Sequence, residues 1–111
     1  MAKFLVMYHS PMSAAQQMAS GTPEQAQAGM DAWMAWANKA GSALVDLGTP
    51  LGNAQTVDKS GSKGSSSTAG GYSLLQADSM NAVRELLKEH PHLMVPGNTI
   101  EVHEALPMPG M

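Results

Sequence analysis

The residues of this chain with the chemistry for proton transfer or metal binding are its histidines and a few carboxylates. The chain has four histidines: His9, His90, His92 and His103. With Asp31 or Glu101 they could supply imidazole and carboxylate ligands, for which zinc and iron are the candidate metals. No two histidines have the i, i+4 spacing that places ligands on one helix face, and His90-Pro91-His92 is typical of a loop. We therefore predict no metal site and no bound cofactor.

Aromatic side chains offer a second way to build a site, because a ring can line a pocket for a small molecule. Trp33 lies on the apolar stripe of a predicted helix, which predicts a core position. Trp36 lies at the edge of that stripe, where we expect it to touch a pocket rim or a partner chain. Tyr8 and Tyr72 could direct their hydroxyls into a pocket or pack within a sheet. The spacing of the residues reveals no Ser-His-Asp arrangement.

Composition narrows the classes of function. The 111 residues fit a single domain over residues 1–111, and the net charge of -3 comes with no basic patch, so we expect no nucleic-acid partner. The absence of cysteine excludes disulfides and thiol catalysis. The apolar runs are too short to cross a membrane, and the N-terminal one is too short for a signal peptide. We therefore expect no membrane partner and a cytoplasmic protein.

The longest predicted element is a helix that begins after Thr22 and ends near Gly41. Thr22 is a favourable N-cap, Pro23 suits the first turn, and Gln25 completes a capping box. Gly41 is suited to the C-cap, because glycine tolerates the left-handed conformation there. Apolar residues recur at helical spacing between these limits: Ala26, Met30, Trp33, Met34 and Ala37. This stripe predicts the face that packs on the core.

Strand patterns lie on either side of this helix. Alternating and continuous apolar runs predict these strands: residues 3–9, residues 44–47 with 53–58 as one strand that is kinked or interrupted at residues 48–50, residues 72–77 and residues 99–104. The first of them is apolar on both faces, which predicts a central strand that is covered on both sides. In the last strand, Ile100 and Val102 should point inward and Glu101 and His103 outward.

A second helix and two irregular segments complete the chain. The helix is expected to begin after Asp78 or Ser79 and to end at Pro91. Its apolar face consists of three residues: Val83, Leu86 and Leu87. Residues 59–71 are rich in glycine and serine, which predicts a flexible hairpin connection. Residues 105–111 form a Pro-rich tail that cannot pair within a sheet.

The order of these elements is strand, helix, strand, strand, helix, strand. This order predicts an α+β fold of the ferredoxin-like βαββαβ type, an antiparallel sheet with both helices on one face. The other face would expose Leu5, Met7 and one of Leu74 or Leu75. Exposed apolar patches of this kind usually mark interfaces. We therefore predict a homodimer packed sheet to sheet, as in a dimeric α+β barrel.

Four short segments carry a resemblance to known proteins: Lys3-Phe4-Leu5-Val6-Met7-Tyr8, Ala40-Gly41 through Asp46-Leu47-Gly48, Gly71-Tyr72-Ser73-Leu74-Leu75 and Ile100-Glu101-Val102. Through them nearly the whole chain resembles the YCII-related family of small dimeric α+β barrel proteins. The resemblance implies the same fold and assembly. The Asp-Gly-Pro-Phe motif of one branch of that family is absent here, because residues 59–71 occupy its place.

The resemblance also implies a site. Family members share a histidine on the first helix, an Asp-Pro step after the second helix and a basic residue near the end of the last strand. In this chain Asp31, His90-Pro91 and His103 align with these positions. The acid and the base are thus exchanged, which means either a preserved pair with swapped ends or the loss of the pair. A preserved pair would join Asp31 to His90, or to His92 as the fallback.

If Asp31 lies beside one of these histidines, its charge should raise the pKa of the imidazole, and burial should lower it. The pocket around such a pair is expected to include five further residues: Tyr8, His9, Trp36, Tyr72 and His103.

Three functions remain open at this point. They are acid–base catalysis on a small molecule in a barrel cleft, ligand binding without turnover, and dimerisation as an accessory protein with a vestigial cleft.

Overall fold

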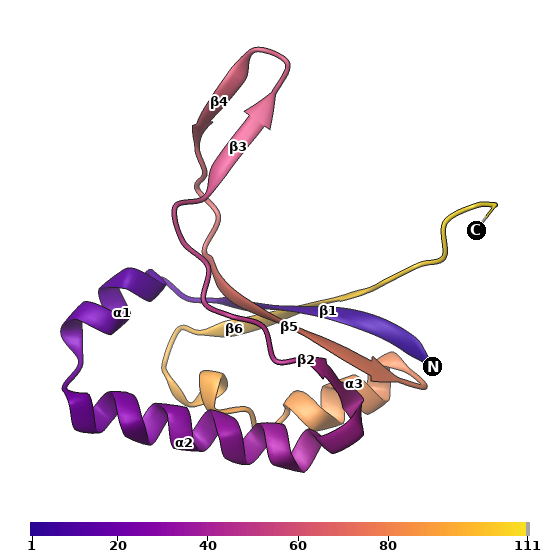
Figure 1. Ribbon diagram of the computed structural model, residues 1–111, viewed down its shortest axis with the longest axis horizontal. Helices are drawn as coiled ribbons and strands as arrows, with labels where there is room; N and C mark the ends of the chain where they lie inside the picture. The colour runs from indigo at the N-terminus through magenta and orange to yellow at the C-terminus, as the bar shows by residue number, and fades with distance from the viewer. Residues whose placement is uncertain (111) are drawn as a thin grey trace.

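The computed structural model describes residues 1–110, with the side chains at positions 14 and 18 left aside, and it shows a mixed α+β fold. A four-stranded antiparallel sheet has the strand order β2-β5-β1-β6 (Figure 1). Its strands are β1 (Ala2–His9), β2 (Leu44–Asp46), β5 (Ala69–Ala77) and β6 (Thr99–Glu104). The predicted α+β class and antiparallel sheet are confirmed.

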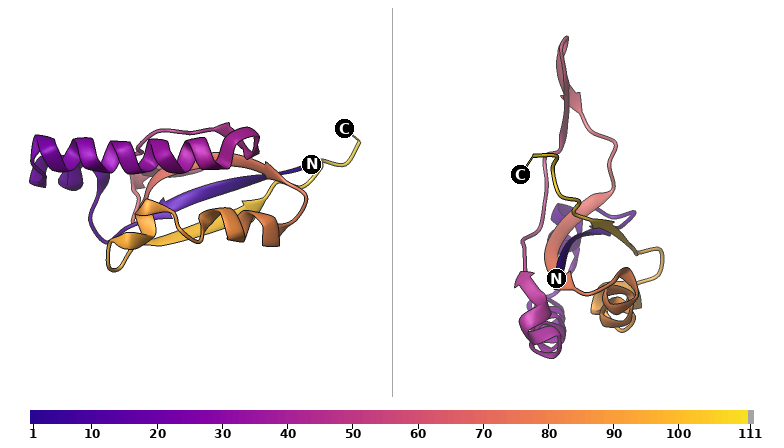
Figure 2. Two further views of the ribbon diagram at one scale, coloured as in Figure 1. Left: turned by 90° about the horizontal axis from the view of Figure 1, so that it is seen from below. Right: turned by 90° about the vertical axis from the view of Figure 1, so that its right-hand side faces the viewer.

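Strand β1 is central, as predicted, and pairs with β5 on one side and β6 on the other. Phe4, Val6 and Tyr8 are buried beneath the helices. Within one chain only this face of β1 is covered, since Leu5 is 37% exposed on the other face, and cover of that face by a partner sheet stays a prediction. The helices lie on one side of the sheet only, so alternate residues of β1 have no cover there (Figure 2).

Helices α2 (Pro23–Ala40) and α3 (Met80–Leu87) lie side by side against the same face of the sheet (Figure 2). The capping box predicted between Thr22 and Gln25 is present, and Gly41 is the C-cap with a φ of 56°. At α3, the hydroxyl of Ser79 accepts a hydrogen bond from the backbone N–H of Ala82. These local signals determine where both helices begin.

The face that α2 turns toward the core differs from the predicted stripe. Trp36, Ala37 and Ala40 are buried, whereas Met30 and Met34 are 58% and 43% exposed. The side of α2 that meets both the sheet and α3 is therefore rotated toward Trp36 relative to the prediction. The stripe that the sequence suggests also includes residues that border a cavity and not the core.

The region between β2 and β5 departs most from expectation. Of the two alternatives for residues 44–58, the interruption is observed, but the two parts do not share a sheet: β2 ends at Asp46, and β3 (Gln55–Asp58) pairs with β4 (Gly61–Gly64) in a separate two-stranded ribbon. This ribbon projects away from the sheet (Figure 1). Residues 59–71, which were expected to be a hairpin connection, contain β4 and the start of β5. Their mobility remains a prediction.

Short segments connect these elements. Helix α1 (Ala14–Ser20) precedes α2, and the 3₁₀ turns η1 (Gly41–Ala43) and η2 (Pro91–Met94) follow α2 and α3. Residues 106–110 of the Pro-rich tail lie outside the sheet and are exposed, while position 111 is outside the described residues. Among the helices of residues 1–110, none has the length and apolar character needed to cross a membrane.

Candidate ligand pocket

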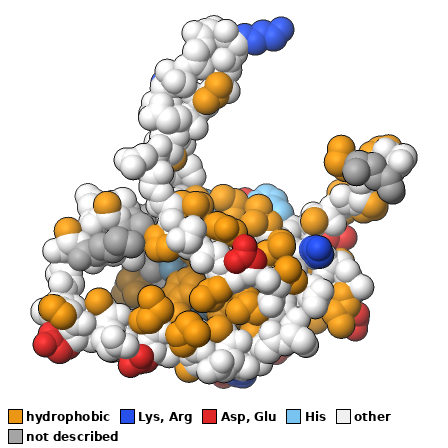
Figure 3. Space-filling model, in the orientation of Figure 1, with side chains coloured by type: hydrophobic (Ala, Val, Ile, Leu, Met, Phe, Trp, Pro, Cys, Tyr) orange, Lys and Arg blue, Asp and Glu red, His pale blue; other side chains and the backbone are white. Residues whose placement is uncertain are grey.

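A cavity of about 360 Å³ lies between α2 and the segment that follows β2. In the space-filling view, apolar side chains border a hollow between α2 and the strands (Figure 3). Helix α2 contributes four residues to its wall: Ala26, Gly29, Met30 and Trp33. A side-chain carbon added at Gly29 would meet nothing within 4 Å, so this glycine leaves open space in the wall.

The wall opposite α2 is mostly backbone and small side chains. It comprises residues 47–50 after β2 and the glycines at the start of β5, Gly70 and Gly71. Gly48 has a φ of 80°, and a side-chain carbon there would lie 1.7 Å from the carbonyl oxygen of Tyr72. Only glycine allows this close approach, which brings the segment after β2 against β5 and so shapes the wall.

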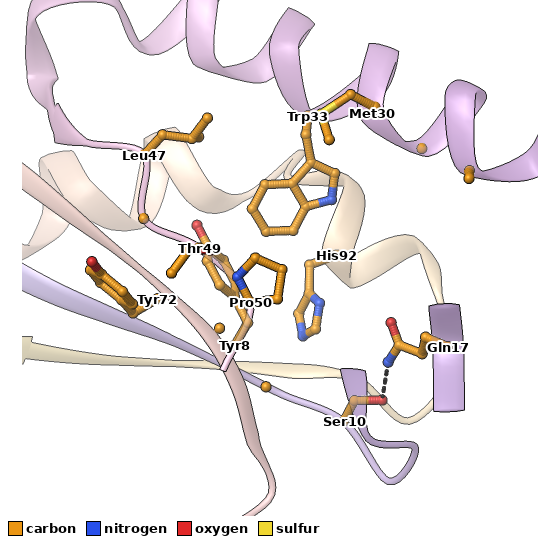
Figure 4. Close-up of a pocket in the computed structure, with 15 residues that line it drawn as sticks. Tyr8, Ser10, Gln17, Met30, Trp33, Leu47, Thr49, Pro50, Tyr72 and His92 are labelled. Carbon is orange, nitrogen blue, oxygen red and sulfur yellow. Dashed lines mark hydrogen bonds between the residues drawn. The ribbon is translucent and has the colours of Figure 1, made fainter. Parts of the chain in front are cut away.

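Aromatic rings line the central part of the pocket. Tyr8 meets Trp33 edge to face, with ring centres 4.8 Å apart, and His92 lies 5.2 Å from Tyr8. Figure 4 shows Trp33, Tyr8 and His92 gathered around the same space. Aromatic rings provide large apolar surfaces with few degrees of freedom, so this cluster favours the binding of an apolar molecule.

The Tyr8 hydroxyl belongs to a buried hydrogen-bond chain. It donates to Ser73 Oγ at 2.8 Å, and Ser73 Oγ donates to the Leu47 carbonyl oxygen at 2.6 Å. Burial raises the pKa of Tyr8 to about 12, against the opposing effect of the Ser73 hydrogen bond. Tyr8 is therefore neutral near pH 7 and is not a general base.

His92 lines the pocket but is held by the backbone. Its Nε2 lies 2.9 Å from the carbonyl oxygen of His9 and 3.1 Å from that of Thr99. Because both partners only accept hydrogen bonds, Nε2 must carry the proton. Its Nδ1 lies 3.4 Å from the side-chain amide nitrogen of Asn98, which can donate to it. Both ring nitrogens are thus occupied, and His92 acts as part of the wall.

His90 lies completely buried next to the pocket. Its Nδ1 accepts a hydrogen bond of 3.0 Å from the backbone N–H of His92, and its ring packs between Trp33 and Trp36 at centroid distances of 4.4 and 4.3 Å. Burial, with a smaller effect of the neighbouring His92, lowers the pKa of His90 to about 4. The imidazole is therefore neutral at physiological pH.

The predicted pair of Asp31 and His90 is not formed. Asp31 is exposed and accepts a 2.8 Å hydrogen bond from Gln27 Nε2. Asp31 precedes Trp33 by two residues, which is a rotation of roughly 200° around the helix axis. Its side chain therefore points away from the indole ring that contacts His90. The fallback with His92 also fails, because the nitrogens of His92 bind other groups. Of the two opposing effects expected on the histidine pKa, only burial acts on His90, because no carboxylate contributes to its pKa.

Of the other predicted pocket residues, two line the cavity and three lie elsewhere in the fold. Tyr8 and Tyr72 line the cavity. Trp36 does not, because it is buried in the core, where its indole N–H donates to the Leu86 carbonyl oxygen at 2.8 Å. His9 and His103 also lie outside it. They hydrogen-bond to the two carboxylate oxygens of Glu101 on the sheet face without helices.

Sequence reasoning missed the polar end of the pocket. There Gln17 Nε2 donates to Ser10 Oγ at 3.0 Å, as Figure 4 shows. Neither residue belongs to a recognisable motif, and only their short separation along the chain hinted at contact. Gly29 was also missed, although a glycine inside an otherwise strong helix is a signal that space is needed beside it.

Within residues 1–110, no group of three or more His, Asp or Glu side chains is arranged to hold a metal ion. Comparison of the chain with protein-family models gives no match, and comparison with curated proteins gives none either. The arguments about function therefore rest on the pocket itself.

Proposed function

We propose that this protein binds a small, uncharged, largely apolar molecule in the pocket and does not catalyse acid–base chemistry there. The main support for this proposal is the absence of charged side chains among the described residues of the pocket wall. The described residues that line it include no Asp, Glu, Lys or Arg, and its histidine has both nitrogens occupied. A charged ligand would lose its hydration without gaining a counter-charge, whereas an uncharged one would gain apolar contacts.

The size of the cavity supports the same proposal. Ligand pockets usually span about 300–1,000 Å³, so a volume of about 360 Å³ suits a compound of one or two rings. The open cavity argues against the alternative of a vestigial cleft, which side chains would fill. The acid–base alternative loses its support with the separation of Asp31 from the histidines.

For the architecture we propose the ferredoxin-like arrangement and a dimeric barrel of the YCII-related kind. Two observations support it: the strand order β2-β5-β1-β6 with antiparallel neighbours, and the position of α2 and α3 on one face. The sheet face without helices presents Leu5 beside its cross-strand partner Leu74. A second copy of the chain, packed on this face, would cover both.

A thermal-shift screen of neutral one-ring and two-ring compounds tests the binding proposal. A ligand at ten times its dissociation constant adds about 1.4 kcal/mol to stability, which should raise the melting temperature by roughly 5 °C. The Gly29→Leu variant fills the cavity and should abolish the shift. Ala28→Leu is the matched control, because Ala28 is an exposed residue of the same helix that does not line the cavity.

The proposal is contradicted if no compound of this class stabilises the wild-type protein. It is equally contradicted if the stabilising compounds act on Gly29→Leu as strongly as on Ala28→Leu, since binding would then lie elsewhere on the molecule.

A further inference from the structure

The polar end of the pocket combines a hydroxyl and an amide whose remaining hydrogen-bonding capacity can be deduced. Both Ser10 and Gln17 line the cavity, and Ser10 is only 9% exposed. Gln17 Nε2 donates to Ser10 Oγ and to the Met12 carbonyl oxygen, each at 3.0 Å. Both hydrogens of the Gln17 amide are therefore used within the protein.

The orientation of the Gln17 amide follows from these partners. The Met12 carbonyl oxygen can only accept, so a reversed amide would place two oxygens in contact there. The amide oxygen, Oε1, consequently lies on the other side, turned toward the cavity in Figure 4. Within the described residues it has no hydrogen-bond partner. It is thus a free acceptor at the end of the pocket.

Ser10 offers the complementary group. Its Oγ accepts hydrogen bonds from Gln17 Nε2 and from the backbone N–H of Met12, at 3.0 and 3.2 Å. Because both lone pairs of Ser10 Oγ accept hydrogen bonds, only its hydroxyl proton can still form one. This proton has no acceptor among the described residues. A free donor and a free acceptor therefore lie side by side.

The walls next to this end are nearly free of side chains. Gly29 and Ala26 face the cavity from α2, and Gly70 and Gly71 face it from β5. Trp33 and Pro50 add flat apolar surfaces, as Figure 4 shows. A space bounded by flat and small groups accommodates a planar ring better than a branched chain.

We propose that the pocket recognises neutral planar ring compounds that carry a primary or secondary amide, including lactams. The ligand carbonyl accepts from the Ser10 hydroxyl, and the ligand N–H donates to Gln17 Oε1. This inference rests on the proposed function and names its ligand class. A carboxylate in the same position would set a second acceptor against Gln17 Oε1, and an ammonium would have no carboxylate partner among the described lining residues.

Calorimetric titration with three ligands of the same ring system tests this inference: 2-naphthamide, N,N-dimethyl-2-naphthamide and 2-naphthoate. We expect 2-naphthamide to bind at least about tenfold more tightly than the other two. The dimethyl compound has no N–H to donate to the Gln17 oxygen, and the carboxylate adds charge and loses the donor.

Variants assign the preference to the two residues. Gln17→Met keeps a side chain of similar length without the acceptor, so it should reduce the ratio between 2-naphthamide and its dimethyl derivative to near one. Gln27→Met is the control, because it removes an exposed amide of α2 and should leave the ratio unchanged. Ser10→Ala should weaken both amides by a similar factor, since both retain the carbonyl, and it provides an independent test of the site.

The outcomes separate this inference from the proposal on which it rests. If all three ligands bind with similar affinity and Gly29→Leu abolishes binding, the pocket function stands and the amide preference is wrong. Tightest binding by 2-naphthoate would also overturn the preference. If none of the three binds, the amide preference is overturned, and the thermal-shift screen of other neutral compounds decides the pocket function separately.

Discussion

His90 combines complete burial with a nitrogen, Nε2, that has no hydrogen-bond partner among the described residues. Its other nitrogen accepts from the backbone of His92, so the proton lies on Nε2 and points into aromatic surroundings. A second proton would place a charge among rings with no carboxylate to balance it. Burial therefore makes His90 a structural residue that is sensitive to acid.

We expect the stability of the protein to fall as the pH decreases from about 6.5 to about 4. In the unfolded chain His90 takes up a proton near its ordinary pKa of 6.5, whereas in the folded chain its pKa is about 4. The stabilisation is complete above pH 6.5 and is lost progressively down to pH 4, by roughly 3 kcal/mol in total. Urea unfolding at a series of pH values measures this loss.

Replacement of His90 by Phe should flatten that pH dependence, even if the variant is less stable at pH 7. Val57→Ala is the control, since Val57 is an exposed residue of the projecting ribbon without a titratable side chain, and its replacement should leave the slope nearly unchanged. Equal slopes for the wild type and His90→Phe would show that His90 is not the group responsible.

At the scale of elements, the turn after β2 separates the main sheet from the projecting ribbon of β3 and β4. Gly48 is the residue that makes this turn, with a φ of 80° and its α-carbon close to the Tyr72 carbonyl oxygen. The backbone N–H of Gly48 donates to Asp46 Oδ1 at 2.9 Å, which fixes the start of the turn. The same turn directs residues 47–50 along the pocket.

Gly48→Ala should therefore destabilise the protein by at least about 2 kcal/mol, because the methyl group would meet backbone atoms of β5 and the φ angle disfavours other residues. Gly52→Ala is the matched control, since an added carbon there meets nothing within 4 Å and its φ is not in the left-handed region. Chemical denaturation of both variants compares them. Similar stabilities would mean that the close approach at Gly48 is not required.

The whole molecule is more extended than an ordinary compact domain of the same length. Its radius of gyration is 15.5 Å, compared with about 13 Å for an ordinary compact domain of this size. The projecting ribbon and the tail account for the difference (Figure 1). The sheet face opposite the helices also leaves Leu5 exposed beside Leu74. One copy of the chain thus leaves surface that a second copy could bury.

We expect light scattering at micromolar concentration to give a mass near twice the 11.6 kDa of one chain. An interface of this kind should bury about 1,600 Å² or more. The double replacement Leu5→Lys with Leu74→Lys places charges on adjacent strands of the open face, so it should produce a monomer. Val57→Lys alters an apolar residue that is 74% exposed on the projecting ribbon and should leave the dimer intact. A monomeric wild-type protein would contradict the expectation.

The amino-acid sequence by itself determined those features that depend on neighbours along the chain. The start of α2 was predictable because Thr22 and Gln25 bind each other's backbone within one turn. The buried face of β1 was predictable because side chains alternate along a strand. Tyr8 and Tyr72 line the cavity, which is one of the two positions that their place in the strands allowed.

Only the tertiary structure decided which distant groups meet. The rotation of α2 brings the Trp36 indole to the carbonyl of Leu86, fifty residues away, and this turns Asp31 to solvent. His92 is bound by the backbone of His9, which lies 83 positions earlier. No local pattern encodes such contacts, because their energies depend on how the sheet and the helices pack as a whole. The separation of the acid from the histidines, and with it the character of the pocket, is therefore a property of the fold.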